Sequence, residues 1–176
     1  MEHTKSFLTE LDALNFHLVE NNRRPGKMTP KIHNPVKNPI VQSEFWKAIE
    51  YLKNKGGLTK TEFKKISSLI CGVTKNKRGF AYRNKTGFYK FCVPYWAYKK
   101  QGSFKGRKIF RITHRLNSYF VYYIAHEISH VLNSPKARSH GHKFYKIFTR
   151  VCPIELQHYE LGYKTKTASK YIKEAK

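Results

Sequence analysis

An apolar segment that leads directly into a histidine pair constrains this chain more than any other feature. Residues 119–125 are apolar on nearly every side of a helix, and residues 126–130 then read His-Glu-Ile-Ser-His. A helix that is apolar all round is buried. Buried imidazoles and carboxylates need partners, because an unpaired polar group in a core costs several kcal/mol. We therefore expect this segment to form a buried helix whose end carries a partnered cluster of two histidines and a glutamate.

The spacing of these three side chains suits a metal ion. Residues four apart share one face of a helix, so His126 and His130 can bind the same ion. Glu127 lies about 100° further round the helix and can reach a water on that ion. Two ligands and a general base on one rigid element are typical of zinc hydrolases, so we expect Zn²⁺ as the cofactor and Glu127 as the catalytic residue. The competing interpretation is a pair of core histidines bonded to the backbone and a Glu127 held in an ion pair.

A zinc site needs at least three protein ligands, so another side chain must join the pair. The candidates that follow in the sequence are His140, His142, Glu155 and Glu160. The two histidines lie nearer to the pair, just past a loop, and either of them could be the ligand. His158 and Tyr159 come later and could stabilise the oxyanion of a tetrahedral intermediate. For Tyr159 the competing interpretation is a core aromatic on a short helix.

The pentapeptide 126–130, followed by His140-Gly141-x-x-Phe144, resembles the SprT-like zinc metallopeptidases, the group of Spartan, SprT and the WLM-related proteins. The resemblance covers roughly residues 43–163 and is greatest to small, stand-alone phage and bacterial members. It implies a zincin-like active-site helix, with His140 as the third zinc ligand beside the pair. It also implies an endopeptidase that cleaves proteins bound or crosslinked to DNA. Unlike many members, the chain shows no C-terminal zinc-binding module, since its three cysteines form no Cys-x-x-Cys pair.

The charge of the chain points to a polyanionic partner. The 35 Lys and Arg residues against 11 Asp and Glu leave a formal net charge of +24, and no acidic residue occurs between Glu62 and Glu127. Cations in this stretch alternate with aromatics, a combination that can follow a phosphate backbone and stack on unpaired bases. We therefore expect DNA, including single-stranded DNA, as a partner. The expected nucleic-acid-binding residues are Lys99, Lys100, Lys105, Arg107 and Lys108. The alternative is that the aromatics belong to the core and the lysines are merely solvated.

Periodicity and turn signals predict an α+β chain with one folded domain. Residues 1–20 are predicted as an N-terminal amphipathic helix, 21–42 as a basic Pro-rich linker, 43–163 as the metallopeptidase domain and 164–176 as a basic C-terminal tail. Within the domain we expect helices over 43–54, 59–70, 117–132, 141–151 and 153–160, and strands over 79–83, 88–93 and 107–113. The strands should form a small antiparallel three-stranded sheet packed with helices.

The spacing of the cysteines and the hydropathy of the chain indicate the cellular compartment in which the protein is expected. Three scattered cysteines predict no disulfide framework, which indicates a reducing, cytoplasmic location, the host cytoplasm if a phage encodes the chain. No secretory signal is visible, and no apolar run approaches the roughly 20 residues that span a bilayer. We expect a monomer with no membrane contact. The alternative function is a basic nucleic-acid-binding protein with a purely structural zinc site; a metal-dependent nuclease is disfavoured, because no carboxylate cluster accompanies the motif.

Overall fold

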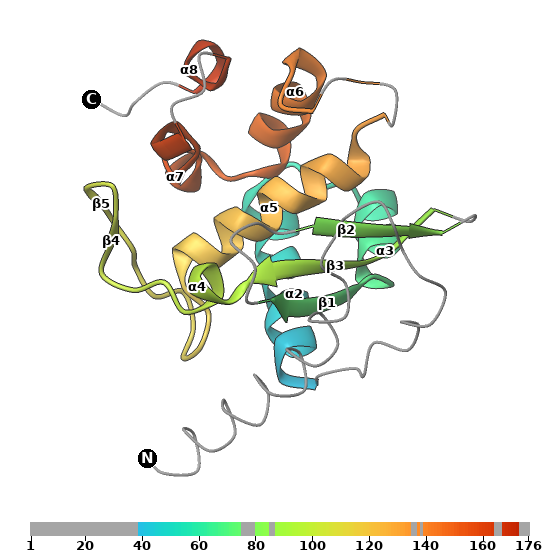
Figure 1. The fold of residues 1–176 in the computed structure, drawn as a ribbon, viewed down its shortest axis with the longest axis horizontal. Helices are drawn as coiled ribbons and strands as arrows, with labels where there is room; N and C mark the ends of the chain where they lie inside the picture. Colours follow the sequence, from blue (N-terminus) through green and yellow to red (C-terminus); the bar gives the residue numbers. More distant parts are fainter. Residues whose placement is uncertain are drawn as a thin grey trace.

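The computed structural model describes residues 39–74, 80–84, 87–134, 137, 139–163 and 167–172. The predicted N-terminal helix, and residues 21–38 of the predicted linker, lie outside this part of the chain. The described elements are α2 (Pro39–Lys55), α3 (Lys60–Ser67), β1 (Ile70–Thr74), β2 (Phe80–Asn84), β3 (Gly87–Pro94), α4 (Tyr95–Tyr98), β4 (Ser103–Phe104), β5 (Arg107–Lys108), α5 (Ser118–Leu132), α6 (His142–Val151), α7 (Ile154–Gln157), the 3-10 helix η1 (Glu160–Tyr163) and α8 (Ala168–Tyr171). Helices and small sheets are combined, which confirms the α+β class (Figure 1).

Helix α5 lies at the centre of the fold, and its first half is buried as the apolar sequence predicts. The sheet and α2 pack on one side of it, and α6 and α7 pack on the other (Figure 1). The Asn117 side chain caps the helix by accepting a hydrogen bond from the Phe120 amide at 2.8 Å. Every residue from 118 to 125 is buried. The helix that carries the histidine pair is therefore held rigidly from both sides.

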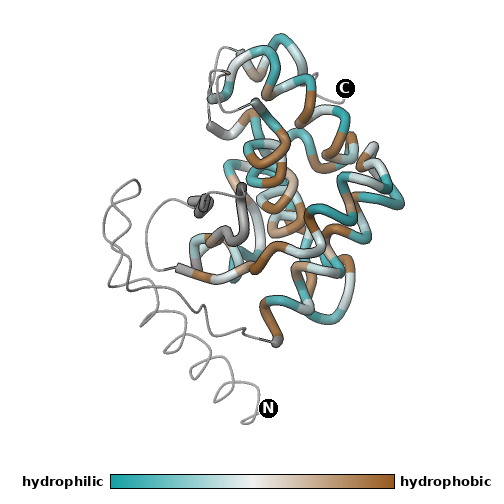
Figure 2. The backbone as a smooth tube through the Cα atoms, turned by 90° about the vertical axis from the view of Figure 1, so that its right-hand side faces the viewer, coloured by the Kyte–Doolittle hydropathy of each residue, from teal (hydrophilic) through white to brown (hydrophobic). Residues whose placement is uncertain are grey.

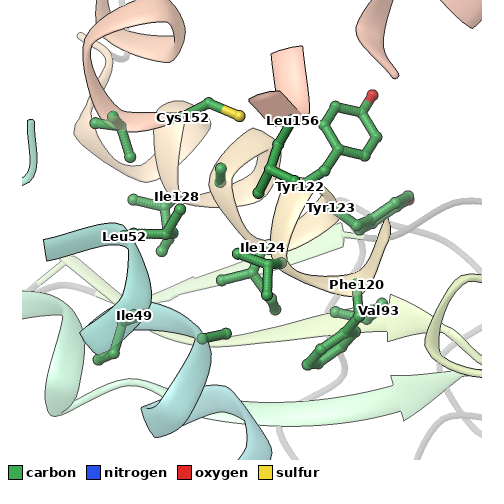
Figure 3. Packing of buried hydrophobic residues seen from close by; sticks show 14 of the residues in the cluster. Ile49, Leu52, Val93, Phe120, Tyr122, Tyr123, Ile124, Ile128, Cys152 and Leu156 are labelled. Atoms are coloured by element: carbon green, nitrogen blue, oxygen red, sulfur yellow. The ribbon is translucent and has the colours of Figure 1, made fainter. Parts of the chain in front are cut away.

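Large side chains around α5 form the hydrophobic core. Leu52 of α2, Val93 of β3 and Leu156 of α7 gather around the apolar faces of α5 (Figure 3). Tyr122 of α5 is almost completely buried among them, and each such aromatic removes about 150–250 Å² of surface from water. Hydrophilic and hydrophobic residues alternate along the helices, as expected for elements with one face in the core and one in solvent (Figure 2).

The first two described helices differ from the prediction only at their ends. Helix α2 begins at Pro39, four residues before the predicted start, with proline in the first turn where its missing N–H costs nothing. Helix α3 has the predicted capping box: the Thr59 hydroxyl accepts from the Glu62 amide at 3.2 Å, and the Glu62 carboxylate accepts from the Thr59 amide at 3.0 Å. The predicted helix extends to residue 70, but α3 ends at Ser67 because residue 70 is taken into β1.

The main sheet differs from the predicted one in its third strand. β2 and β3 pair in antiparallel orientation as predicted, but β1 pairs with β3 in parallel, in the order β1-β3-β2. The prediction of an all-antiparallel sheet containing residues 107–113 is therefore wrong. Of that segment, only β5 is a strand, and it pairs with β4 in a separate hairpin. Burial explains the difference: Cys71 and Val73 of β1 lie in the core, whereas Lys108 and Arg111 are exposed cations that a covered sheet would not accommodate.

The C-terminal helices pack back onto α5. Helix α6 agrees with the predicted helix over 141–151, whereas the predicted helix over 153–160 is divided between α7 and η1. The predicted tail contains α8, in which Ala168 is fully buried, followed by the buried Ile172. The ring of Tyr171 stacks on that of Tyr145 in α6, with centroids 5.9 Å apart. Part of the predicted tail is therefore packed against the domain that contains the histidine pair.

The cysteines are core residues. Cys71, Cys92 and Cys152 are all buried, and none of the three is in a disulfide. Burial raises the pKa of the Cys152 thiol well above its usual value, and the charges of Glu160 and Glu155 raise it further, so this thiol is a poor nucleophile. In the ranges that the structure describes, no helix is long and apolar enough to cross a membrane.

Candidate metal centre and active site

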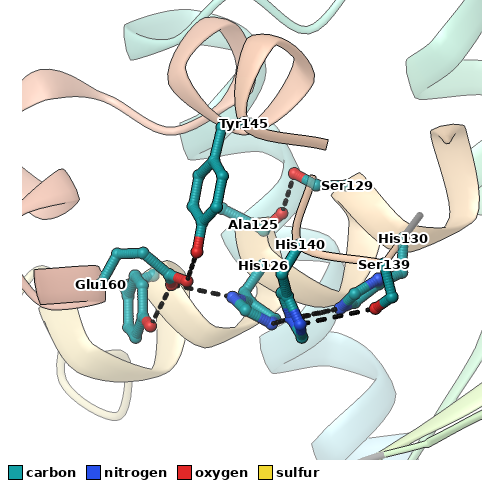
Figure 4. Close-up of polar contacts among 9 residues, drawn as sticks. Ala125, His126, Ser129, His130, Ser139, His140, Tyr145 and Glu160 are labelled. Atoms are coloured by element: carbon teal, nitrogen blue, oxygen red, sulfur yellow. Dashed lines mark hydrogen bonds and ion pairs between the residues drawn. The ribbon is translucent and has the colours of Figure 1, made fainter. Parts of the chain in front are cut away.

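Three histidine side chains converge where the end of α5 meets the start of α6. The Nε2 atoms of His126 and His130 lie 3.2 Å apart, and Nε2 of His140 lies 3.0 Å from the first and 3.1 Å from the second (Figure 4). In the described part of the chain, this is the only group of three or more His, Cys, Asp or Glu side chains placed to hold a metal ion. The predicted ligand set is therefore brought together.

The triangle of nitrogens fits a divalent ion. Imidazoles that bind zinc at about 2.0–2.1 Å with tetrahedral geometry have nitrogens about 3.3 Å apart, close to the distances of 3.0–3.2 Å seen here. A neutral imidazole carries only one N–H, so three converging nitrogens cannot all be satisfied by hydrogen bonds to one another. Imidazole ligands suit zinc, copper, iron or nickel rather than magnesium or calcium. The residues present thus fit a transition-metal or zinc ion.

Local backbone geometry places the third histidine. His140 has a φ of +55°, in the left-handed region that only a few per cent of non-glycine residues adopt. This conformation costs about 1–2 kcal/mol for an L-residue, and strain of this kind is concentrated at functional sites. Ser139 Oγ lies 3.4 Å from Nδ1 of the same imidazole, and Gly141 then begins α6 as its N-cap. The strained turn thus directs the His140 ring toward the end of α5.

The other aromatic candidates are engaged elsewhere. His142, the alternative third ligand, is hydrogen-bonded through Nδ1 to the Tyr171 hydroxyl. Tyr159 is buried, with its hydroxyl 2.8 Å from Ser118 Oγ near the other end of α5. The ring of His158 lies against that of Tyr159, with centroids 4.2 Å apart. These contacts lie outside the histidine cluster, so the structure does not bring His158 or Tyr159 to the candidate active site.

A phenylalanine ring supports all three imidazoles. Phe144, the last residue of the His-Gly-x-x-Phe element, is fully buried. Its ring centroid lies 5.1 Å from that of His126, 4.5 Å from that of His130 and 4.9 Å from that of His140. One apolar side chain thus restricts the orientation of every ligand and excludes water from one side of the cluster. The family pattern marks this residue, but its spacing does not reveal its contact with the histidine rings.

Glu160 holds the ring of His126 from the opposite side. Its Oε2 accepts hydrogen bonds from Nδ1 of His126 at 2.8 Å and from the Tyr122 hydroxyl at 2.6 Å, and its Oε1 accepts one from the Tyr145 hydroxyl at 3.0 Å (Figure 4). The carboxylate is 1% exposed. A proton on Nδ1 leaves the Nε2 lone pair directed at the centre of the triangle, the usual arrangement of metal-binding histidines. From the sequence, Glu160 is a possible metal ligand. In the structure, Glu160 instead binds His126 and orients its imidazole ring.

Phe144 and Glu160 together fix the orientation of the His126 ring. Family models, curated proteins and solved structures all give no significant match to this chain.

Burial and proximity favour neutral imidazoles at two of the three positions. Burial lowers the pKa of His130 to about 3, with further lowering by the charges of His126 and His140. Burial, followed by the charge of His126, also lowers the pKa of His140. Burial would lower the pKa of His126 too, but the charge and hydrogen bond of Glu160 and the charge of Glu127 outweigh it and raise that pKa. Neutral rings present the lone pairs that a metal requires.

Glu127 is a buried carboxylate next to the first ligand. Its side chain is 7% exposed. Burial raises its pKa to about 7, against the lowering effect of the His126 charge, and Glu160 raises it further. A divalent cation beside it would lower this value.

The structure divides the five predicted nucleic-acid-binding cations into two groups. Lys99 and Lys100 follow α4 and line a surface cavity, whereas Lys105, Arg107 and Lys108 belong to the β4–β5 hairpin. The Lys105 ammonium donates to the carbonyl oxygen of Gly162, which ties the hairpin to η1. Lys105 thus has a structural contact that the sequence does not indicate.

Replacing the buried carboxylate should weaken metal binding without removing a ligand. We expect Glu160→Gln to lower zinc affinity by about 10–100-fold, the usual effect of removing the partner of a ligating histidine. Zinc affinity is measured by competition with a chromogenic chelator. Glu155→Gln is the matched control, because Glu155 is an exposed carboxylate on α7. Tyr145→Phe, which removes one hydrogen bond to Glu160, should have a smaller effect in the same direction; unchanged affinity in both variants would contradict the assigned role.

Proposed function

We propose that the chain is a zinc-dependent endopeptidase of SprT-like type. The observation that carries the proposal is the triangle of Nε2 atoms, 3.0–3.2 Å apart, with the buried carboxylate of Glu127 on the same helix. A structural zinc is closed by four protein ligands, whereas a catalytic zinc keeps one position open. Three side chains converge in the described part of the chain. This count favours a peptidase over the alternative, a basic nucleic-acid-binding protein with a structural zinc.

The proposed reaction is hydrolysis of a peptide bond with Glu127 as general base and acid. Zinc held by the three imidazoles would supply a water whose pKa is lowered toward about 7 and would polarise the scissile carbonyl. Glu127 takes a proton from the attacking water and delivers it to the leaving amine. Glu160 keeps the proton of His126 on Nδ1, so that Nε2 stays available as a ligand. Phe144 excludes water from the apolar side of the cluster.

The proposed substrates are proteins bound or crosslinked to DNA, encountered in a reducing, cytoplasmic compartment by a monomeric enzyme. The support for this part is the net charge of +24 together with the family resemblance. A strongly basic surface raises the local concentration of the enzyme on a polyanion, and such binding weakens steeply with salt. DNA would therefore bring the peptidase to its substrates.

Zinc-dependent cleavage of a DNA-bound protein tests this proposal. The purified chain, loaded with one equivalent of zinc, is incubated with a protein bound to single-stranded DNA, and fragments are identified by mass spectrometry. Cleavage should stop when a chelator removes the metal and should return when zinc, but not magnesium, is added back. A zinc-loaded protein that produces no fragments from free or DNA-bound substrates would contradict the proposal.

A further inference from the structure

A surface cavity lies at the N-terminal end of α5, away from the histidine cluster. Its volume is about 580 Å³, and its walls come from residues 98–102, 109–111 and 114–117. Pockets for small molecules measure roughly 300–1,000 Å³. The cavity is thus large enough for one unit of a polymer or for a small ligand.

Hydrogen bonds between the three segments hold the cavity in shape. The Ile109 amide donates to the carbonyl oxygen of Gly102 at 2.9 Å. The Asn117 side-chain amide donates to the carbonyl oxygen of Lys100 at 3.1 Å, while its oxygen caps α5. The walls are therefore joined to one another and to the central helix. A ligand would meet a preformed site and would have little chain to order on binding.

Among the residues that the structure describes, the lining is cationic and includes no carboxylate. Its charged members are Lys99, Lys100, Arg111 and Arg115. Asn117, the N-cap of α5, also lines the cavity, so the positive end of the helix dipole adds to this field. A site of this charge favours an anion, and arginine in particular suits the oxygens of a phosphate.

An apolar surface adjoins these cations. Tyr98, Ile109, Phe110 and Leu116 complete the lining. Phe110 is 38% exposed, which is unusual for a side chain of this size. Bare phosphate or a chain of acidic side chains would use the cations and leave this surface in water. A nucleotide uses both, because its base can lie against an aromatic ring while its phosphate meets the arginines.

We propose that this cavity binds one unpaired nucleotide of a single-stranded nucleic acid, with the base against Phe110 and the phosphate against Arg111 and Arg115. The inference rests on the nucleic-acid partner of the proposed function and gives that partner a site. Asn117 and His126 are nine residues apart on α5, about 13 Å along the helix axis. The cavity would therefore anchor the nucleic acid near the histidine cluster without taking part in the chemistry.

Fluorescence anisotropy with a labelled oligothymidylate of about twelve nucleotides tests the site. We expect Arg115→Ala to weaken binding and to reduce the slope of log affinity against log salt by about 0.7, the value for a single phosphate contact on a single strand. Phe110→Leu keeps an apolar side chain but removes the ring, so binding should weaken by about fivefold or more with the salt slope unchanged. As controls, Lys146→Ala removes an exposed cation from α6, and Trp46→Leu removes an exposed aromatic ring from α2, both outside the cavity. Both variants should leave the affinity for oligothymidylate unchanged. Thermal melting of each variant shows whether it is folded.

The outcomes separate this inference from the proposed function. Oligothymidylate binding that is equal in Arg115→Ala, Phe110→Leu and the controls would overturn the cavity assignment while leaving a nucleic-acid partner in place. A labelled hexaglutamate peptide that binds as tightly, with the same dependence on Arg115 and Phe110, would make the cavity an acidic-peptide site and overturn the inference. Absence of any oligothymidylate binding would overturn both statements about nucleic acid. None of these measurements needs zinc, so zinc-dependent cleavage is judged independently.

Discussion

Glu127→Gln is expected to abolish peptide hydrolysis while leaving zinc bound. An amide of the same shape cannot take a proton from the attacking water, and a general acid–base group contributes about 10²–10⁴-fold to the rate, so kcat should fall by at least about 100-fold. The fold should survive, because the substitution removes a charge from a site only 7% exposed and adds none. The measurement is the initial rate of cleavage of a DNA-bound protein at saturating substrate, with the zinc content of each preparation determined alongside.

A carboxylate outside the cluster provides the comparison for this variant. Glu155 on α7 is exposed and accepts a hydrogen bond from the Tyr51 hydroxyl at 3.0 Å. Glu155→Gln should therefore cleave like the parent protein. A Glu127→Gln protein that holds one zinc and also cleaves like the parent would refute the peptidase and leave the structural-zinc interpretation in its place.

His140→Ala is expected to remove most of the zinc affinity and, with it, the activity. Two histidines four residues apart would remain, one fewer than the three ligands that zinc sites require. Removing the hydrogen-bond partner of a metal ligand already lowers metal affinity by about 10–100-fold. Removing a ligand itself should therefore weaken zinc binding by at least about 100-fold. Competition with a chromogenic chelator measures the affinity, and circular dichroism checks that the helices are retained. His140 lies in the turn before α6, so its loss leaves the α5 core intact.

The neighbouring histidine makes a stringent control. His142 differs from His140 by two positions and is hydrogen-bonded to Tyr171 rather than to the cluster. His142→Ala should keep one zinc per chain and cleave at close to the parent rate. If instead the His142 variant lost zinc and the His140 variant kept it, the assignment of the third ligand would be reversed.

Elements with strong local signals are predicted well from the sequence. Helix α5 agrees with its prediction because a continuous apolar run and the Asn117 cap both act within a few residues of one another. The start of α3 is predicted equally well, since the capping box of Thr59 and Glu62 closes over three positions. The end of α3 is not predicted correctly, because Ile70 belongs to β1 and pairs with Lys90 of β3. A strand partner twenty residues further along the sequence does not change the helical pattern of residues 59–70.

The predicted third strand fails for a related reason. Residues 107–113 alternate apolar and polar positions only imperfectly, and a strand covered by helices must also present a face that can be buried. The exposed Lys108 and Arg111 do not meet this requirement, while Cys71 and Val73 of β1 do. The packing of the predicted tail could not be predicted from the sequence either. Ala168 is buried against elements that precede it in the chain, so its burial depends on tertiary contacts.

The sequence by itself determined the histidine pair, the adjacent carboxylate and the buried helix that carries them, because a 3.6-residue period places these groups on one element without help from the rest of the chain. The third histidine was indicated only through the family resemblance, and tertiary structure decided how it reaches the pair and what holds the pair in place. His140 reaches the cluster through a left-handed backbone turn, and Glu160 reaches His126 from 34 positions further along the chain. Such contacts depend on how separate elements pack against one another, and no local spacing encodes that packing.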